Sequence, residues 1–160
     1  MARIAESELI INSDGSVFHL HILPEDIADT VILVGDQNRV EMIARYFDQG
    51  SIICNKASRE FHTITGSYNG KPVTVISTGI GTDNIDIVMN ELDALANIDF
   101  ATREPKDTHR TLDILRIGTC GCVRPDIPLG GFVLSEAGIG CDGLLNWYAS
   151  GHKVSDSDME

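Results

Sequence analysis

Arg39 is the first side chain whose type and position could do chemistry, because it follows a glycine turn. The apolar run Thr30–Val34 ends in Gly35, and Arg39 comes four residues later, where a helix is expected to begin. Glycine turns and helix starts present backbone N–H groups and a partial positive charge to an anion, and a guanidinium adds two parallel donors. The segment fits an oxyanion-binding site, although a solvated surface arginine explains this segment alone equally well.

Arg116 carries a stronger signal, because it interrupts an apolar run. It lies among Ile114, Leu115 and Ile117, directly before Gly118-Thr119. A charge inside a buried strand is costly unless it is paired or binds a ligand. We therefore interpret Arg116 as a ligand-binding residue, with the Thr119 hydroxyl as a donor beside it. The alternatives are an outward-facing position on an edge strand and a structural ion pair.

Other polar residues carry less information by themselves. Arg59 precedes Glu60 and is typical of a loop ion pair, and His19 is more often structural than catalytic in such a position. Cys120 and Cys122 form a C-x-C pair with no further ligands nearby, so a zinc site is not expected. Caps and surface charge are the expected roles of Asp36, Asp83, Asp86 and Glu91.

The elements that must position these residues alternate between strand and helix, which predicts an α/β fold with a mixed central sheet and flanking helices. Three apolar runs end in a turn that contains glycine, and ligands of open α/β sheets bind beyond the carboxyl ends of the strands. Asn69-Gly70 predicts a type I′ hairpin. Thr82 or Asp83 is expected to cap a helix whose apolar face holds Ile85, Val88, Met89, Leu92, Leu95 and Ala96. The expected strands are Thr30–Val34, Phe61–Tyr68, Pro72–Ser77, Asp113–Ile117 and Gly131–Ala137, with a first helix from Val40 to about Phe47 and a loop over Asp99–His109.

Length and charge exclude several classes of protein. The chain has 160 residues, enough for one compact domain, and its formal net charge of −12 disfavours nucleic acid as a partner. No apolar run is long enough to span a membrane, and no signal peptide is evident. The four cysteines follow no disulfide spacing and are typical of reduced thiols in a cytoplasmic protein.

Taken together, the segments resemble the nucleoside phosphorylase family in its uridine phosphorylase branch. They keep the family's order from residue 17 to about residue 148. The matching stretches are Val17-Phe18-His19-Leu20, Val34-Gly35-Asp36-Gln37-Asn38-Arg39, Arg59-Glu60-Phe61, Ser77-Thr78-Gly79-Ile80-Gly81, Glu91-Leu92, Arg116-Ile117-Gly118-Thr119 and Asp126-Ile127-Pro128-Leu129-Gly130.

The resemblance implies a pentosyltransferase that cleaves a nucleoside with inorganic phosphate, giving free base and ribose 1-phosphate, as in nucleoside catabolism and pyrimidine salvage. Phosphate is a co-substrate, and the reaction needs no organic cofactor. The resemblance also implies a homodimer or higher homo-oligomer with a shared active site. A purine nucleoside phosphorylase and a non-catalytic phosphate- or nucleoside-binding module are the alternatives.

The same resemblance assigns roles to particular residues. Phosphate would be bound by the turn at Gly35 and by Arg39, Arg59, Arg116 and Thr119. Arg59 and His19 would come from the neighbouring subunit, with His19 reaching the ribose 5′-hydroxyl. Some members bind a potassium ion at the dimer interface, and the matching positions here are Glu60, Ile80 and Asn84.

This sequence departs from the family pattern in four ways. Gln37 replaces the usual proline, and Asn84 stands where serine is more usual. Cys120-Gly121-Cys122 replaces the more usual serine or threonine, glycine and a small residue, and the bulk of Cys122 puts the geometry of that tight loop in question. The base-reading half of the family has no counterpart, so residues 1–160 are expected to form a single partial nucleoside phosphorylase domain with a truncated phosphorylase/hydrolase-like fold. We expect such a chain by itself to be weak or inactive.

Overall fold

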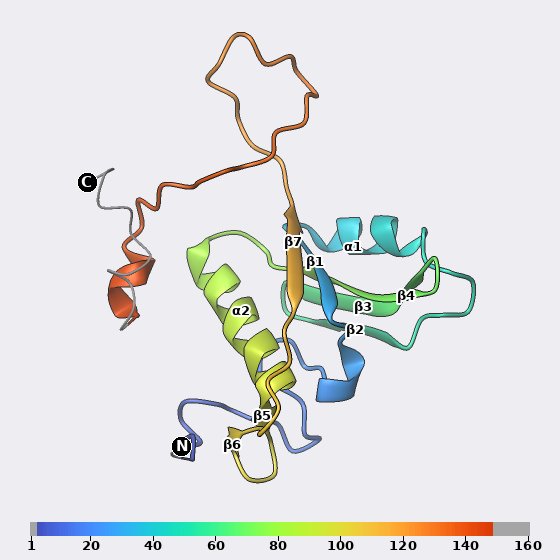
Figure 1. Cartoon of the computed structure of the whole chain (residues 1–160), viewed down its shortest axis with the longest axis vertical. Coiled ribbons are helices and arrows are strands. Elements are labelled where there is room, and N and C mark those ends of the chain that lie inside the picture. Colours follow the sequence, from blue (N-terminus) through green and yellow to red (C-terminus); the bar gives the residue numbers. More distant parts are fainter. Residues whose placement is uncertain (1–2, 149–160) are drawn as a thin grey trace. The chain divides into compact units, whose positions relative to one another are not determined.

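The computed structural model describes residues 3–148 of the chain (Figure 1). It divides into two units, Met1–Gly118 and Thr119–Glu160. The first unit contains a five-stranded sheet, both α-helices and a short two-stranded sheet. The prediction of one domain over residues 1–160 therefore stays a prediction, and the two units are described separately.

The main sheet joins an antiparallel half to a parallel half. Its strand order is β2-β3-β4-β1-β7, in which β2, β3 and β4 pair antiparallel, whereas β1 pairs parallel with both β4 and β7. The last residue of β1, Val34, lies opposite Ser77 of β4 and Ile117 of β7, so three carboxyl ends are level at one edge. The strands are β1 (Thr30–Val34), β2 (Cys54–Ser58), β3 (Phe61–Tyr68), β4 (Lys71–Ser77) and β7 (Asp113–Ile117).

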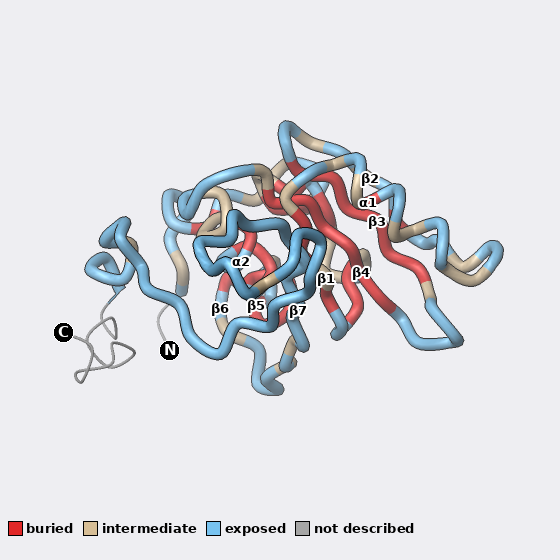
Figure 2. Tube along the Cα trace, turned by 90° about the horizontal axis from the view of Figure 1, so that it is seen from above, coloured by how far each residue is buried: buried red, intermediate tan, exposed pale blue. Residues whose placement is uncertain are grey.

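The helices α1 (Gln37–Ala44) and α2 (Thr82–Asn97) bury the central strands on both faces (Figure 2). Successive strand residues point to opposite faces, and β1 divides accordingly. Leu33 joins a core cluster with residues of α2, whereas Val34 joins a second cluster with Val40 of α1. The α2 cluster also takes in Val17, Leu20 and Ile22 of the N-terminal segment. The prediction that β1 is buried on both faces is thus confirmed.

The smaller elements lie at the ends of this core. A 3₁₀ turn, η1 (Pro24–Asp26), precedes β1, and β5 (Ile98–Asp99) pairs antiparallel with β6 (Glu104–Pro105). The second unit contains η2 (Leu144–Trp147) and no strand within residues 119–148. No helix in the described part of the chain has the length and apolar character that a bilayer-spanning helix requires.

Several predicted boundaries are confirmed, and others shift for local reasons. The bounds of β1, β3 and β7 match the prediction, and β4 begins one residue earlier, at Lys71. Asn69 and Gly70 have φ values of 51° and 74°, as a type I′ turn requires. Helix α1 begins at Gln37 rather than Val40, because the Asp36 side chain accepts a 2.9 Å hydrogen bond from the Asn38 N–H and caps it.

Four expectations are wrong. Gly81 occupies the cap position of α2, so neither Thr82 nor Asp83 caps it. Met89 is 40% exposed rather than part of the buried face of α2. The expected loop Asp99–His109 contains β6 and the end of β5. Residues 131–137 form no strand, because strand-forming residues become a strand only where a partner backbone pairs with them.

Cys54 should resist alkylation that modifies the other three cysteines. All four are free thiols, but Cys54 is buried whereas Cys120, Cys122 and Cys141 are exposed. Burial, with a smaller contribution from the charge of Asp26, raises the pKa of Cys54 to about 11. The thiolate is the reactive form, so at pH 8 only about a thousandth of Cys54 is reactive. Mass spectrometry after brief iodoacetamide treatment should find three alkyl groups in the native chain and four in urea. Native labelling of Cys54 as fast as that of Cys141 would contradict this prediction.

Candidate functional site

The candidate site lies at the edge where β4, β1 and β7 end together (Figure 1). Each strand runs into a glycine-containing turn, as the sequence predicts. The Thr78 N–H after β4 donates to the Val34 carbonyl at 2.7 Å, and a Cβ placed on Gly35 would lie only 3.7 Å from the Gly79 carbonyl oxygen. The first two turns are therefore adjacent. In open α/β sheets this is the edge at which ligands bind.

Arg39 lies in the first turn of α1, directly beyond the turn at Gly35. It is half-buried, and its own N–H donates to the Asp36 carbonyl at 3.1 Å. Arg39 and the partial positive charge of the helix start thus belong to the same end of α1. This is the placement that an oxyanion-binding role requires, and the role itself stays a prediction.

Arg116 reaches the same edge, but the premise used to single it out is wrong. Strand β7 is exposed along its whole length because it is the last strand of the sheet, so Arg116 occupies an edge strand rather than a buried one. Its register partner is Leu33, which packs on the α2 face. The guanidinium turns toward the strand end, since a Cβ on Gly118 would lie 2.5 Å from its Nη1 atom. Arg39 and Arg116 therefore approach one edge from its two faces, and their convergence on one anion stays a prediction.

Thr119, the predicted hydroxyl donor, begins the second unit. Thr119 is exposed. Its participation in the site stays a prediction.

Arg59 and His19 are brought together in a second group. Arg59 lies in the turn between β2 and β3 with a φ of 55°, a conformation unusual for a residue with a side chain. Its guanidinium carbon lies 5.2 Å from the centroid of the Phe18 ring, and Phe18 in turn contacts the His19 ring edge-to-face at 4.9 Å. Gln37, where the family usually has proline, donates a 2.7 Å hydrogen bond to the Arg59 carbonyl. The loop ion pair with Glu60 is not among the salt bridges of residues 3–148.

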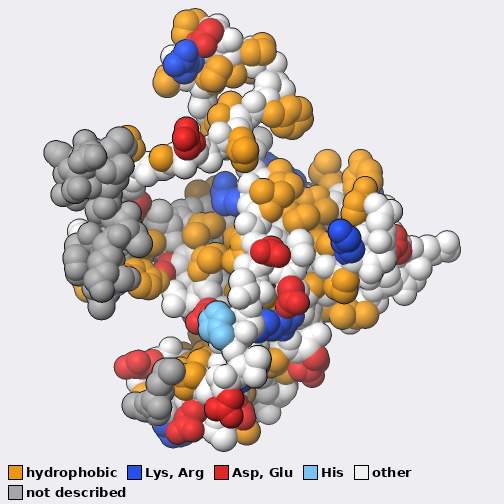
Figure 3. All heavy atoms as spheres, viewed as in Figure 1, with side chains coloured by type: hydrophobic (Ala, Val, Ile, Leu, Met, Phe, Trp, Pro, Cys, Tyr) orange, Lys and Arg blue, Asp and Glu red, His pale blue; other side chains and the backbone are white. Residues whose placement is uncertain are grey.

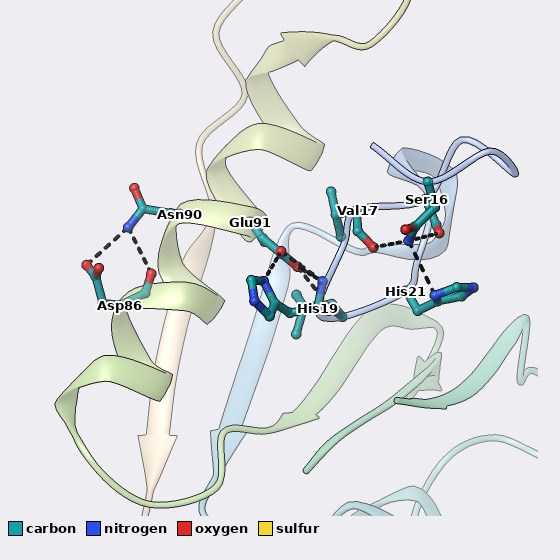
Figure 4. Close-up of polar contacts among 9 residues, drawn as sticks. Ser16, Val17, His19, His21, Asp86, Asn90 and Glu91 are labelled. Atoms are coloured by element: carbon teal, nitrogen blue, oxygen red, sulfur yellow. Dashed lines mark hydrogen bonds and ion pairs between the residues drawn. The ribbon is translucent and has the colours of Figure 1, made fainter. Parts of the chain in front are cut away.

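Glu91 is the functional candidate that the sequence analysis missed. It is 8% exposed on α2, and its carboxylate contacts the His19 ring at 2.7 Å (Figure 4). It was expected to be a cap or a surface charge, which is wrong. A signal was available, because residues 88, 91, 92 and 95 repeat at helical spacing on the buried face of α2. A carboxylate at such a position must be paired.

The three residues matched to a potassium site lie close together. Gly79 has a φ of 67°, and a Cβ there would be 2.7 Å from the Asn84 amide nitrogen and 3.0 Å from Glu60 Cγ. The same amide nitrogen of Asn84 donates a 3.2 Å hydrogen bond to the Ile80 carbonyl. A hydrogen-bond donor directed at the carbonyl does not fit a cation held between these groups. The potassium ion stays a prediction, and no step proposed below depends on it.

An apolar hollow of about 220 Å³ lies away from the sheet edge, on the α1 side of the sheet. Hydrophobic side chains are also exposed on the face of the molecule that Figure 3 shows, and the exposed ones of α1 and β7 are Met42, Ile114, Leu115 and Ile117. The hollow lacks charged groups, so it offers nothing that would hold an oxyanion. Its lining residues are Ile32, Ile43, Tyr46, Phe47, Tyr68 and Val73.

The fold and the site define an α/β protein whose parallel strands end in glycine turns flanked by arginines. Residues 29–159 match the Phosphorylase superfamily. The chain belongs to this superfamily, which confirms the family resemblance seen in its motifs.

Individual relatives include both pyrimidine and purine enzymes. A uridine phosphorylase of Thermococcus kodakarensis is 30% identical over 92% of this chain and 47% of its own length, and that of Escherichia coli is 35% identical over 92% and 53%. A DeoD-type purine nucleoside phosphorylase of Bacillus velezensis is 32% identical over 73% of this chain and 44% of its own. A solved Trypanosoma brucei nucleoside phosphorylase with uridine phosphorylase activity superposes with a TM-score of 0.69 at 40% identity, over 75% of this chain and 41% of its own. The chain thus spans about half the length of the relatives it matches.

Proposed function

We propose that the protein containing this chain is a pentosyltransferase that cleaves uridine with inorganic phosphate to uracil and ribose 1-phosphate, in nucleoside catabolism and salvage. Its relatives include uridine phosphorylases that match 92% of the chain. The single observation that carries the proposal is the level ending of β4, β1 and β7 in glycine turns, with Arg39 and Arg116 at that edge.

In this proposal the protein neutralises and positions phosphate rather than forming a covalent intermediate. Backbone amides at Gly35, the guanidinium groups of Arg39 and Arg116 and the Thr119 hydroxyl bind the oxyanion. A phosphate oxygen attacks the anomeric carbon as the bond to the base breaks, and the electron pair of that bond leaves with the base. The bound dianion stabilises the positive charge that develops on the sugar.

We also propose that two copies of the chain share each site. Arg59 and His19 lie in one group around Phe18, and the resemblance to nucleoside phosphorylases assigns both side chains to the site of a neighbouring subunit. A second copy supplies Arg59 to the phosphate and His19 to the ribose 5′-hydroxyl. The free thiols fit the reducing environment of the cytoplasm, which is the proposed compartment.

The test is phosphate-dependent release of uracil from uridine, followed by liquid chromatography with ribose 1-phosphate as the second product. We expect release by the whole protein in phosphate buffer and none in a phosphate-free buffer of equal ionic strength. Inosine in a parallel assay tests the purine alternative, which the match to purine nucleoside phosphorylases supports. Release of base without phosphate would indicate hydrolysis. Phosphate-dependent thermal stabilisation without release of any base would indicate a binding module.

A further inference from the structure

The Glu91 carboxylate receives more hydrogen bonds than a helix surface residue would need. The backbone N–H of His19 donates to its two oxygens at 2.9 and 3.2 Å, and the backbone N–H of Leu20 donates to Oε2 at 2.9 Å. The fourth contact, at 2.7 Å, joins Oε1 to Nδ1 of the His19 ring. One buried carboxylate on α2 therefore holds both the backbone and the ring of His19 (Figure 4).

The hydrogen-bond inventory of Glu91 fixes the direction of the contact with the ring. Both of its oxygens already accept from backbone amides, so the group acts as an acceptor. The Nδ1 atom of His19 must then be the donor. In a neutral imidazole only one nitrogen carries a proton, so Nε2 is left with a lone pair.

Within residues 3–148, Nε2 of the His19 ring has no hydrogen-bond or ion-pair partner. The His19 side chain is 28% exposed, whereas that of Glu91 is 11% exposed, so the ring extends from a buried anchor toward the surface. Two aromatic rings hold it edge-to-face, Phe18 at 4.9 Å and Phe61 at 6.5 Å between centroids. The ring is thus fixed in orientation as well as in tautomer.

We infer that Glu91 is a positioning residue that directs Nδ1–H of His19 toward its own carboxylate, so that in the neutral ring Nε2 is an acceptor for a ligand hydroxyl. The inference rests on the proposed function for the identity of that hydroxyl, the 5′-hydroxyl of a nucleoside. A site of this kind selects a ligand that donates a hydrogen bond and disfavours one that lacks the hydroxyl.

The tautomer can be tested without any enzymatic activity, by long-range proton–nitrogen NMR correlation of the histidine rings in the full chain above pH 8. His19 should show the Nδ1–H pattern. His62 provides an internal reference, because its Nε2 atom lies 2.9 Å from Asn55 Oδ1 and it should show the opposite pattern. In Glu91→Gln, where the carboxamide has only one acceptor oxygen, the Nδ1–H pattern of His19 should be lost while the Nε2–H pattern of His62 persists. An Nε2–H pattern for His19 in the unmodified chain would overturn the inference.

A binding comparison separates positioning from simple anchoring of the loop. Isothermal titration in phosphate buffer would compare uridine with 5′-deoxyuridine. Glu91→Gln should weaken uridine binding about tenfold and change 5′-deoxyuridine binding less than about twofold. The reason is that only uridine has the 5′-hydroxyl that donates a hydrogen bond to Nε2. Glu91→Gln should add nothing to the loss caused by His19→Ala. Glu41→Gln is the control, because Glu41 is exposed on α1 and the substitution removes the same charge. It should leave both affinities unchanged.

The outcomes separate this inference from the proposed function. Equal weakening of both nucleosides with an unchanged His19 tautomer would make Glu91 a structural anchor only and overturn the inference. If neither nucleoside binds but Glu91→Gln still changes the tautomer, the proposed function fails and the positioning role stands. If the His62 pattern shows that Glu91→Gln does not fold, Glu91→Asp replaces it. That variant keeps the charge, withdraws the oxygens by one methylene and should lower the Nδ1–H fraction.

Discussion

Replacing Phe61 by alanine should lower the free energy of unfolding by about 3–5 kcal/mol. Phe61 is 1% exposed at the start of β3 and belongs to the α2 core cluster. Removal of its ring deletes buried apolar area and leaves a cavity that the surrounding sheet can close only partly. Because domains are stable by about 5–15 kcal/mol, the loss is a large share of the total. Urea unfolding followed by circular dichroism measures it.

Two comparisons make the Phe61 result specific. Leu115→Ala removes an apolar side chain that is 54% exposed on β7 and should cost less than about 1 kcal/mol. Phe61→Leu keeps most of the volume and should fall between the two. The His19 ring also loses its neighbour in Phe61→Ala, so its proton resonances should shift. Equal losses for Phe61→Ala and Leu115→Ala would mean that β3 does not lie in the core.

Four of the five strands of the main sheet, β1, β3, β4 and β7, could be predicted because apolar or β-branched residues dominate them. Thr30–Val34 shows the continuous apolar pattern of a parallel strand covered on both faces. In the structure its side chains enter the core clusters on both faces of the sheet. The pattern identifies the strand but not its partners. It cannot say that β7 is the last strand, so the burial inferred for Arg116 was wrong even though the bounds of β7 were right.

Elements that depend on contacts distant in the sequence could not be predicted. Cys54–Ser58 has a polar composition, and it becomes β2 only because β3 offers a partner backbone. Residues 131–137 show the reverse case. Their side chains favour a strand, but their backbone pairs with no other strand within the described residues. Strand propensity describes fit to a half-buried pleated surface, and the surface must exist before the propensity has an effect.

The candidate site likewise has a part that could be predicted from local sequence and a part that depends on contacts between distant residues. The glycine turns and Arg39 follow from local sequence, because a turn and a helix start are made by neighbouring residues. The contact of Glu91 with His19 joins positions 72 residues apart, and the stacking of Arg59 on Phe18 joins two separate loops. Only the family resemblance pointed to His19 and Arg59, and it assigned no role to Glu91.

Replacing Arg116 by alanine should weaken phosphate binding about 10- to 100-fold, because a charge-assisted hydrogen bond to an anion contributes about 1.5–3 kcal/mol. Ligand binding raises the melting temperature in proportion to the logarithm of ligand concentration over Kd. The phosphate-dependent rise in melting temperature should therefore begin at correspondingly higher phosphate concentration in Arg116→Ala. Chloride at equal ionic strength corrects for screening.

Gly118→Ala tests whether phosphate binding needs the Arg116 guanidinium at the end of β7. The substitution leaves the charge of Arg116 unchanged. A methyl group on Gly118 would lie 2.5 Å from Arg116 Nη1, so the side chain must move away from the strand end. Gly118 is absent from the residues with positive φ, so alanine adds no backbone strain there. Arg45→Ala is the control, since Arg45 is exposed at the other end of α1 and its loss changes net charge equally. If Arg116 binds phosphate directly, Gly118→Ala should weaken binding and Arg45→Ala should not. Equal effects of the two arginine variants would mean that phosphate responds only to the overall charge of an acidic protein, and the oxyanion site would then have to be abandoned.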